Sequence, residues 1–308
     1  MTFISEKKIN GKKRKYLEKS IRLPDNTVKK ISVYLKDGAE LKIAEKELQA
    51  FVTFDVDNYG TTQIFTEKDF KRIEDIRLGY KKIISSLTVN QINDIIDRFT
   101  VNFTYETNAI EGSSLTLKDV TIIIKEGNTI RGKELREIYE TVNTRDAIDL
   151  LFRKKPRLNA KSILNLHTML VKNTGVSFGY KKFPNFLLNR YVQTTKPEKV
   201  KEEMNSLIEW YHQTKNIHPL QKAGIFHGRF EKIHPFEDGN GRVGRLLINL
   251  ILLEHRYPPL IIRKTQRIAY FNALEAFDNN HPDRLLRFLV EKYKDTYDKF
   301  FRIYVKYL

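Results

Sequence analysis

The sequence of 308 residues contains no cysteine. A disulfide scaffold, thiolate chemistry and cysteine-based zinc sites are therefore excluded, and the absence of thiols suits a reducing compartment. Long apolar runs are missing too, because the longest, at 246–253 and 258–262, fall far short of the ~20 residues that cross a bilayer. The first eight residues also lack the apolar stretch of a signal peptide. We therefore expect a cytoplasmic protein that makes no membrane contact.

Acidic residues are the scarcer charged type. The chain has 38 Asp and Glu against 55 Lys and Arg, which leaves a formal net charge of +17. Such a surface can attract nucleic acid, acidic membranes or acidic proteins. Many lysines stand beside acids, as in 42–47 and 199–203, which favours an ordinary solvated surface. A basic nucleic-acid-binding protein stays as the less favoured alternative, since no base-reading motif accompanies the charge.

One stretch, HPFEDGNGRVGR at 234–245, differs from ordinary scaffold and runs directly into the apolar segment 246–253. We interpret it as a loop that leads into the N-terminus of a buried helix. Gly239 and Gly241 leave backbone N–H groups unobstructed at that N-terminus, an arrangement that binds phosphate. Arg242 and Arg245 would lie on one face of the first turn, where cations are unfavourable unless an anion lies between them. The pattern predicts an anion site.

Two other side chains of this stretch suit phosphate chemistry. Asp238 adjoins the glycines, where a carboxylate can hold Mg²⁺ against phosphate oxygens. His234 stands at the start of the loop, and a histidine with an ordinary pKa of about 6.5 can act as a general base near neutral pH. The alternative is a glycine-rich turn with surface arginines and a structural histidine. That alternative explains neither the paired arginines nor the Asp-Gly-Asn-Gly run.

The stretch resembles the signature of the Fic (Fido) family, H-x-F-x-[DE]-G-N-G-R-x-x-R, at every specified position, and the likeness continues into 257–259 and 267–274. The resemblance implies a protein adenylyltransferase that moves AMP from Mg²⁺·ATP to a Tyr, Thr or Ser hydroxyl of a target protein and of itself. It implies these roles: a catalytic base at His234, a structural residue at Phe236, a magnesium ligand at Asp238, and contacts to the nucleotide from Asp238, Gly239, Asn240, Gly241, Arg242 and Arg245.

Two alternatives to AMP transfer stay open at the same site. Related Doc-type kinases carry lysine at the position of Gly241, so this glycine favours AMP transfer over phosphorylation. Removal of AMP, or transfer of another phosphate-containing group, would use the same residues.

Residues 107–112, TNAIEG, resemble the family's inhibitory motif, [ST]-x-x-x-E-[GN]. By pattern alone they are the end of a helix, with Gly112 as its C-terminal stop. The resemblance implies that Glu111 pairs with Arg245 and occupies the place of the γ-phosphate, so that the enzyme is autoinhibited in the class II manner. The same glutamate could position a water for the removal of AMP.

Two more parts of the site follow from the resemblance alone. Residues 185–193 would belong to a β-hairpin flap that binds the target protein by strand addition. Within the flap, the residues over the nucleotide would be Asn189, Arg190, Tyr191 and Val192. A helix over 265–278 would supply the adenine slot with Tyr270, Phe271, Leu274 and Asp278. Asp278 stands where relatives often have asparagine, so the hydrogen bonding of adenine stays open.

The remaining pattern predicts a mainly α protein, a Fic/Fido helical bundle with a small β-hairpin flap and an N-terminal β-hairpin region. We expect a hairpin over 13–35 and a helix over 40–51 within residues 1–60. A helical segment with the 107–112 motif would follow over 61–154, its helix from residue 89 capped by Thr88. The catalytic core would span 155–292, with His167 and His227 as core histidines, and a C-terminal helix would fill 293–308. The identity of the target protein and the formation of a homo-oligomer stay open.

Overall fold

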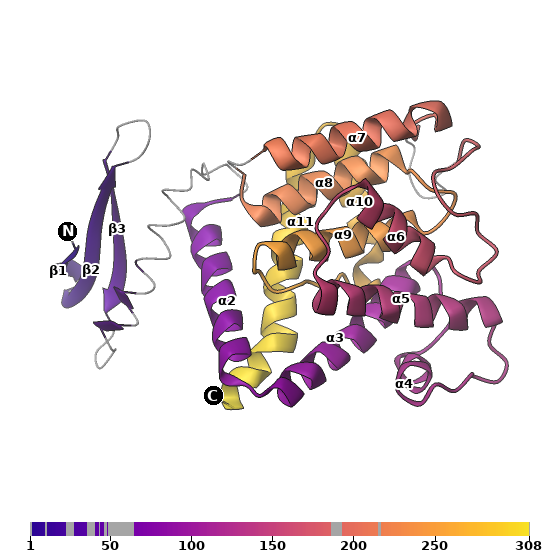
Figure 1. Cartoon of the computed structure of the whole chain (residues 1–308). Helices are drawn as coiled ribbons and strands as arrows, with labels where there is room; N and C mark the ends of the chain where they lie inside the picture. Colours follow the sequence, from indigo (N-terminus) through magenta and orange to yellow (C-terminus); the bar gives the residue numbers. More distant parts are fainter. Residues whose placement is uncertain are drawn as a thin grey trace. The chain divides into compact units, whose positions relative to one another are not determined.

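The computed structural model describes residues 2–9, 11–22, 28–35, 65–185, 193–214 and 217–307, together with 41–42, 44–45 and 48. The protein is mainly α-helical with a small antiparallel sheet near its N-terminus (Figure 1). This confirms the predicted fold class. The chain forms two compact units, Met1–Asp75 with Lys215–His218 and Ile76–Thr214 with Pro219–Leu308. The division predicted at residues 60, 154 and 292 stays a prediction.

The first unit contains the sheet β1–β2–β3, formed by Thr2–Ile9, Lys12–Arg22 and Val28–Leu35. The predicted hairpin over 13–35 is β2 and β3, and its turn at 24–26 lies outside the described residues. Strand β1 was not predicted, because its sequence, TFISEKKI, is almost entirely exposed and lacks a buried apolar alternation. One face of the sheet packs against the described residues of the predicted helix 40–51, and these are helical. The buried apolar residues are Leu17, Ile31, Val33, Ala44 and Leu48.

The second unit begins with α2 (Glu67–Ser86, shared with the first unit), α3 (Val89–Ile110), α4 (Leu117–Glu126) and α5 (Leu135–Lys154), and residues 107–112 stand at the end of α3. Thr88 caps α3 as predicted, and its hydroxyl accepts from the backbone N–H of Gln91. Gly112 ends the helix with φ of +108°, a left-handed conformation that favours glycine. Residue 107 and residue 111 therefore lie one turn apart at the end of α3.

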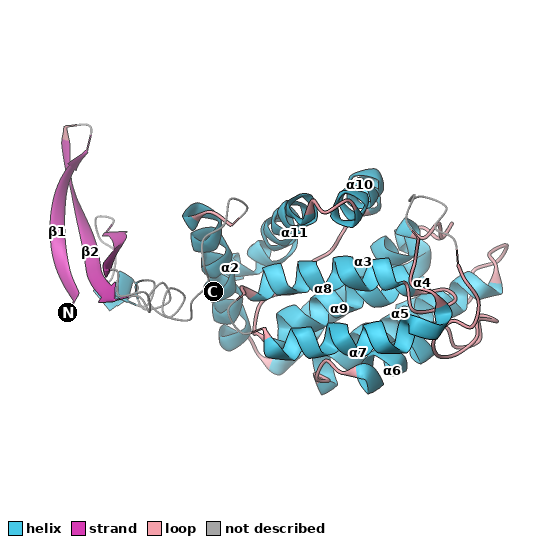
Figure 2. Ribbon diagram, turned by 90° about the horizontal axis from the view of Figure 1, so that it is seen from above, coloured by secondary structure: helices cyan, strands magenta, loops and turns pink. Residues whose placement is uncertain are grey.

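The centre of the second unit is α9 (Asn240–Glu254). It is contacted by α3, by α5, by α6 (Ala160–Leu170) and by α8 (Pro219–Ile233), while α7 (Pro197–Gln213) packs on α6 and α8. Figure 2 shows α8 and α9 side by side in the middle of the helices. The two backbones approach closely at Gly244, where an added Cβ would meet His227 and Glu231 of α8. Nearly every residue of α9 is buried, so its N-terminus is held in a defined position.

The C-terminal part comprises η1 (Lys264–Gln266), α10 (Arg267–Asp278), α11 (Pro282–Thr296), η2 (Tyr297–Phe301) and η3 (Arg302–Tyr307). The helix predicted over 265–278 is present. The C-terminal helix predicted over 293–308 is α-helical only as far as Thr296, beyond which the backbone widens into a π turn and then tightens into a 3₁₀ helix. Phe301 packs there against Tyr80 and Phe99. These rings lie far earlier in the chain, so a local helical pattern could not reveal the change.

Among the residues that the structure describes, no helix is long and apolar enough to cross a membrane.

Candidate active site

The loop between α8 and α9 is held by contacts on both sides of Phe236, which is fully buried. Its ring stacks on that of His167 with centroids 3.8 Å apart. Its backbone N–H donates to Oδ1 of Asn240, and its carbonyl accepts from Nδ2 of the same side chain, both at 2.9 Å. The carbonyl also accepts from Asn185 at 2.9 Å. Because its amide is committed to Phe236, the side chain of Asn240 shapes the loop and only its backbone remains for a nucleotide.

His167, expected to be a core histidine, is indeed fully buried, but it also positions the loop. Its Nε2 donates to the backbone carbonyl of Asp238 at 3.1 Å. Burial lowers the pKa of His167 to about 4, so the ring is neutral near neutral pH. The apolar pattern around residue 167 predicted its burial, but no signal in the sequence pointed to a partner in the loop.

The N-terminus of α9 is open to an anion. Gly239 is its N-cap residue with φ of +81°, and no side chain among the described residues caps the helix. The first turn contains no acid, while the side chains of Arg242 and Arg245 point from it and are each 3 % exposed. The unpaired N–H groups of a helix start attract negative charge, and two buried guanidinium groups strengthen that attraction.

Glu111 supplies the negative charge. Its Oε1 lies 2.5 Å from Nη2 of Arg245. A Cβ added at Gly241 would collide with this carboxylate, so the carboxylate lies directly over the first turn of α9. The pairing expected from the 107–112 motif is therefore present in the geometry. Nη1 of Arg245 is buried and has no hydrogen-bond partner among the described residues, so one strong donor at this position is left for an anion.

Thr107 holds the same arginine, a contact that the sequence pattern did not predict. Its hydroxyl accepts from Nε of Arg245 at 2.7 Å, and its backbone carbonyl accepts from Nη2 at 3.1 Å. Thr107 and Glu111 thus grip one guanidinium from the last turn of α3. The threonine at the start of the motif has a direct structural role.

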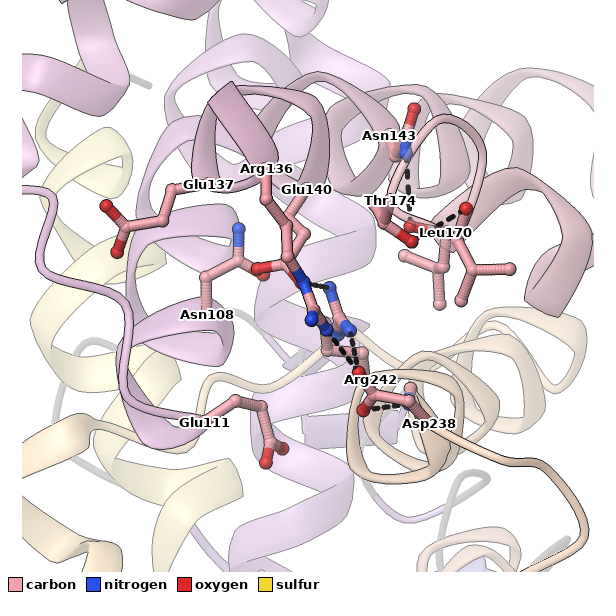
Figure 3. Close-up of polar contacts among 12 residues, drawn as sticks. Asn108, Glu111, Arg136, Glu137, Glu140, Asn143, Leu170, Thr174, Asp238 and Arg242 are labelled. Carbon is pink, nitrogen blue, oxygen red and sulfur yellow. Dashed lines mark hydrogen bonds and ion pairs between the residues drawn. The ribbon is translucent and has the colours of Figure 1, made fainter. Parts of the chain in front are cut away.

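Asp238 lies at the opposite edge of the anion site and contacts two arginines (Figure 3). Its Oδ2 is 2.5 Å from Nη2 of Arg136 and 3.8 Å from Nη2 of Arg242, and its Oδ1 accepts from the backbone N–H of Gly239. Glu140 contacts the same two arginines. No motif in α5 marks Arg136 and Glu140, so nothing in the sequence predicted their place at the site.

A metal ion could be held here by few groups. Among the described residues, no three acidic, histidine or cysteine side chains cluster in a way that would bind a metal ion. Mg²⁺ that arrives with a nucleotide needs only one or two carboxylates, since phosphate oxygens and waters complete its shell. Asp238, half exposed beside the open N-terminus of α9, fits that limited role.

His234 lies at the end of α8 with φ of +50°, in the left-handed region. Its backbone N–H still donates to Phe230 at 2.9 Å, so the residue closes the helix while turning the chain into the loop. Its Nδ1 lies 3.9 Å from the carboxylate of Glu231, and its side chain is partly exposed. A histidine ring that is partly exposed at the start of the loop can accept a proton from a substrate.

The four residues predicted to form the adenine slot lie at different depths. Tyr270 and Leu274 are each 1 % exposed, and the hydroxyl of Tyr270 lies 2.7 Å from Nε2 of His227. Phe271 and Asp278 are partly exposed. Tyr270 packs beneath Arg245, whose guanidinium lies 5.8 Å from the centroid of the tyrosine ring. Of the four residues, Phe271 and Asp278 are the ones that offer surface to a base.

The predicted flap falls largely outside the described residues. Asn189, Arg190, Tyr191 and Val192 are not described, and residues 174–185 and 193–195 contain turns and no strand. The two described residues near its ends are tied together by Lys181. The Nζ of this lysine donates to Asn185 at 2.7 Å and to Thr194 at 3.0 Å.

Part of the chain is similar to proteins of a known family. Residues 157–252 match the Fic/DOC family. The protein adenylyltransferase fic-1 of Caenorhabditis elegans is 32% identical over 180 residues, which cover 56% of this chain and 35% of the relative. The protein adenylyltransferase Fic of Nematostella vectensis is 28% identical over 203 residues, with coverage of 64% and 47%. The chain therefore spans less than half the length of these two curated relatives.

Solved structures share the fold. A Fic domain-containing signaling protein from Bacteroides thetaiotaomicron aligns with a TM-score of 0.66 at 25% identity, over 73% of this chain and 93% of that one. Residues 134–508 of C. elegans Fic-1 align with a TM-score of 0.67 at 20% identity, over 87% and 78%. The second similarity establishes the fold alone.

Proposed function

Because residues 157–252 form a Fic/DOC-family domain, we propose that this protein is an adenylyltransferase that moves AMP from ATP to a hydroxyl of a target protein and of itself. The names of the curated relatives support this reaction class. The observation that carries the proposal is the carboxylate of Glu111 over Gly241, paired with buried Arg245. A protein anion at that point occupies the place that a phosphate of ATP would take.

The proposed mechanism assigns the phosphates to the N-terminus of α9. Its backbone N–H groups, Arg242 and Arg245 hold negative charge that grows on the leaving group. His234 removes the proton from a Tyr, Thr or Ser hydroxyl, whose oxygen bonds to the α-phosphorus. The bond between that phosphorus and the bridging oxygen breaks, and pyrophosphate leaves. Mg²⁺ held by Asp238 would neutralise part of the phosphate charge.

We further propose that Glu111 inhibits this reaction. A γ-phosphate and the carboxylate would compete for Arg245, whose buried charge requires one of them. Because the side chain of Glu111 is 39 % exposed, it can move away without a rearrangement of α3. Its exposure also favours a second activity, in which Glu111 orients a water molecule and the same site removes AMP. Residues 185–193 would hold the target protein.

The test is the intact mass of the purified protein after incubation with Mg²⁺ and ATP. The variant Glu111→Gly should gain AMP more rapidly than the wild type, and His234→Ala in the same background should gain none. Glu134→Gly is the matched control, because Glu134 is exposed at the N-cap of α5 and makes no side-chain cap bond. ATP labelled at the α- or γ-phosphate distinguishes AMP transfer from phosphorylation. Label from the γ-position on the protein, or AMP on the His234→Ala variant, would refute the assignment.

A further inference from the structure

Four charged side chains form a closed ring beside the anion site, and we call it the Asp238 ring (Figure 3). Arg136 and Arg242 alternate in it with Glu140 and Asp238. Oε1 of Glu140 lies 3.1 Å from Nε of Arg136 and 3.2 Å from Nη1 of Arg242. Oδ2 of Asp238 lies 2.5 Å from Arg136 and 3.8 Å from Arg242. Figure 3 shows the two guanidinium groups together between the two carboxylates.

The ring joins two parts of the sequence. Asp238 and Arg242 belong to the family-matched residues 157–252, whereas Arg136 and Glu140 come from α5, which precedes them. The two α5 residues are one turn apart on the same helix face. The family match therefore does not include half of the ring.

The two contacts of the ring with α9 and its loop differ in burial. The pair of Glu140 and Arg242 is well buried, with side chains 14 % and 3 % exposed. The pair of Arg136 and Asp238 is open to solvent, with side chains 49 % and 45 % exposed. Exposed pairs contribute little and exchange readily, while a buried arginine requires its partner. Glu140 thus fixes Arg242 in place, and the Arg136–Asp238 contact is the one that can open.

We propose that Arg136 is a positioning residue for the divalent cation of the nucleotide, acting through Asp238. Without a cation, the guanidinium of Arg136 neutralises Asp238 and keeps its carboxylate directed toward the anion site. When a cation reaches Asp238, Arg136 has to give up that carboxylate and is retained on α5 by Glu140. The inference rests on the proposed function, in which Asp238 is the cation ligand.

This exchange has two consequences of opposite sign. Removing the positive charge of Arg136 frees Asp238, so the cation should bind at a lower concentration. The same removal leaves the Asp238 carboxylate less compensated beside the phosphates, so a nucleotide without a cation should bind more weakly. A purely structural loss would weaken binding under both conditions.

The experiment measures binding of ADP, which supports no AMP transfer, to the 308-residue protein in the Glu111→Gly background. Fluorescent ADP is titrated in EDTA, and at fixed ADP the Mg²⁺ concentration for half-maximal binding is determined. Arg136→Gln should lower that concentration about two- to five-fold and weaken ADP binding in EDTA by a similar factor, as expected for a half-exposed ion pair. Arg136→Lys retains the positive charge but lacks the forked guanidinium, so its two values should fall between those of the protein with Arg136 and those of Arg136→Gln. Arg131→Gln, at an exposed arginine of the preceding loop, should change neither quantity.

The outcomes separate this inference from the proposed function. If the Glu111→Gly protein binds no ADP in either condition, the proposed nucleotide site is wrong and the inference falls with it. If it binds ADP, two results refute only the role of Arg136. In one, Arg136→Gln weakens both ADP binding in EDTA and the response to Mg²⁺, or strengthens both. In the other, it changes neither. Thermal unfolding of each variant, followed by Trp210 fluorescence, establishes that the protein tested is folded.

Discussion

Gly241 offers a direct test of where the Glu111 carboxylate lies. An alanine there would place its Cβ against Oε1 of Glu111, at the tip of a flexible and partly exposed side chain. The carboxylate should therefore move out, and the cost of Gly241→Ala should be that of losing the pair with Arg245. A fully buried pair that loses one partner costs about 3–5 kcal/mol. Because Glu111 is more than a third exposed and Thr107 still binds Arg245, we expect about 1–2 kcal/mol here.

Glu111→Gly removes the same pair by a different route and should have a similar cost. The two changes should therefore not add, because the collision of the alanine Cβ with the Glu111 carboxylate disappears once that carboxylate is absent, and the next contact is Nη1 of Arg245 at 3.0 Å. The double variant should be about as stable as Glu111→Gly alone. This corresponds to a coupling energy of about 1–2 kcal/mol, within the range measured for residues in contact.

The assay is thermal unfolding of the wild type, the two single variants and the double variant. The single tryptophan, Trp210 on α7, reports on the helical unit. A loss of 1–2 kcal/mol should lower Tm by roughly 2–8 °C in a unit of this size. Additive losses in the double variant would show that Glu111 does not lie over Gly241, and the reasoning about a phosphate mimic would be refuted.

Two further predictions concern residues that hold the site together. Thr107→Val keeps the shape of the side chain but removes the hydroxyl that accepts from Nε of Arg245. It should therefore destabilise the helical unit by about 1–3 kcal/mol. An unchanged Tm would contradict the role of the hydroxyl. His167 has a folded-state pKa of about 4, below the ~6.5 of an unfolded chain, so between these values the unfolded state binds more protons. The free energy of unfolding should therefore fall by about 2–3 kcal/mol as the pH drops from 6.5 to 4. His167→Gln should flatten this part of the curve of Tm against pH. Parallel curves for the wild type and the variant would argue against a neutral, buried ring.

The sequence predicted helix ends correctly where a short segment determines its own structure. The cap at Thr88 and the stop at Gly112 depend on neighbouring backbone groups, and the structure has both where they were predicted. The loop at 234–245 likewise specifies an open helix N-terminus with two arginines, because glycine spacing and helix periodicity are local properties.

The partners of those residues were decided by packing. Asn240 looked like part of the nucleotide site but has its amide bonded to Phe236, while His167 holds the carbonyl of Asp238 from another helix. Tyr270 and Leu274, predicted to line the adenine slot, are both buried. Which face of α10 is buried depends on α8 and α11, and local periodicity does not contain that information.

The order of histidine, acid, glycines and arginines within one loop is a covalent property of the chain, so that order alone was enough to predict an anion site. Which charges meet depends on how the helices pack. It brings the end of α3 and one face of α5 to the start of α9, so that Glu111 and Thr107 share Arg245 while Arg136 and Glu140 enclose Asp238 and Arg242. Ion pairs between helices depend on three-dimensional distance, and separation along a sequence does not reveal that distance.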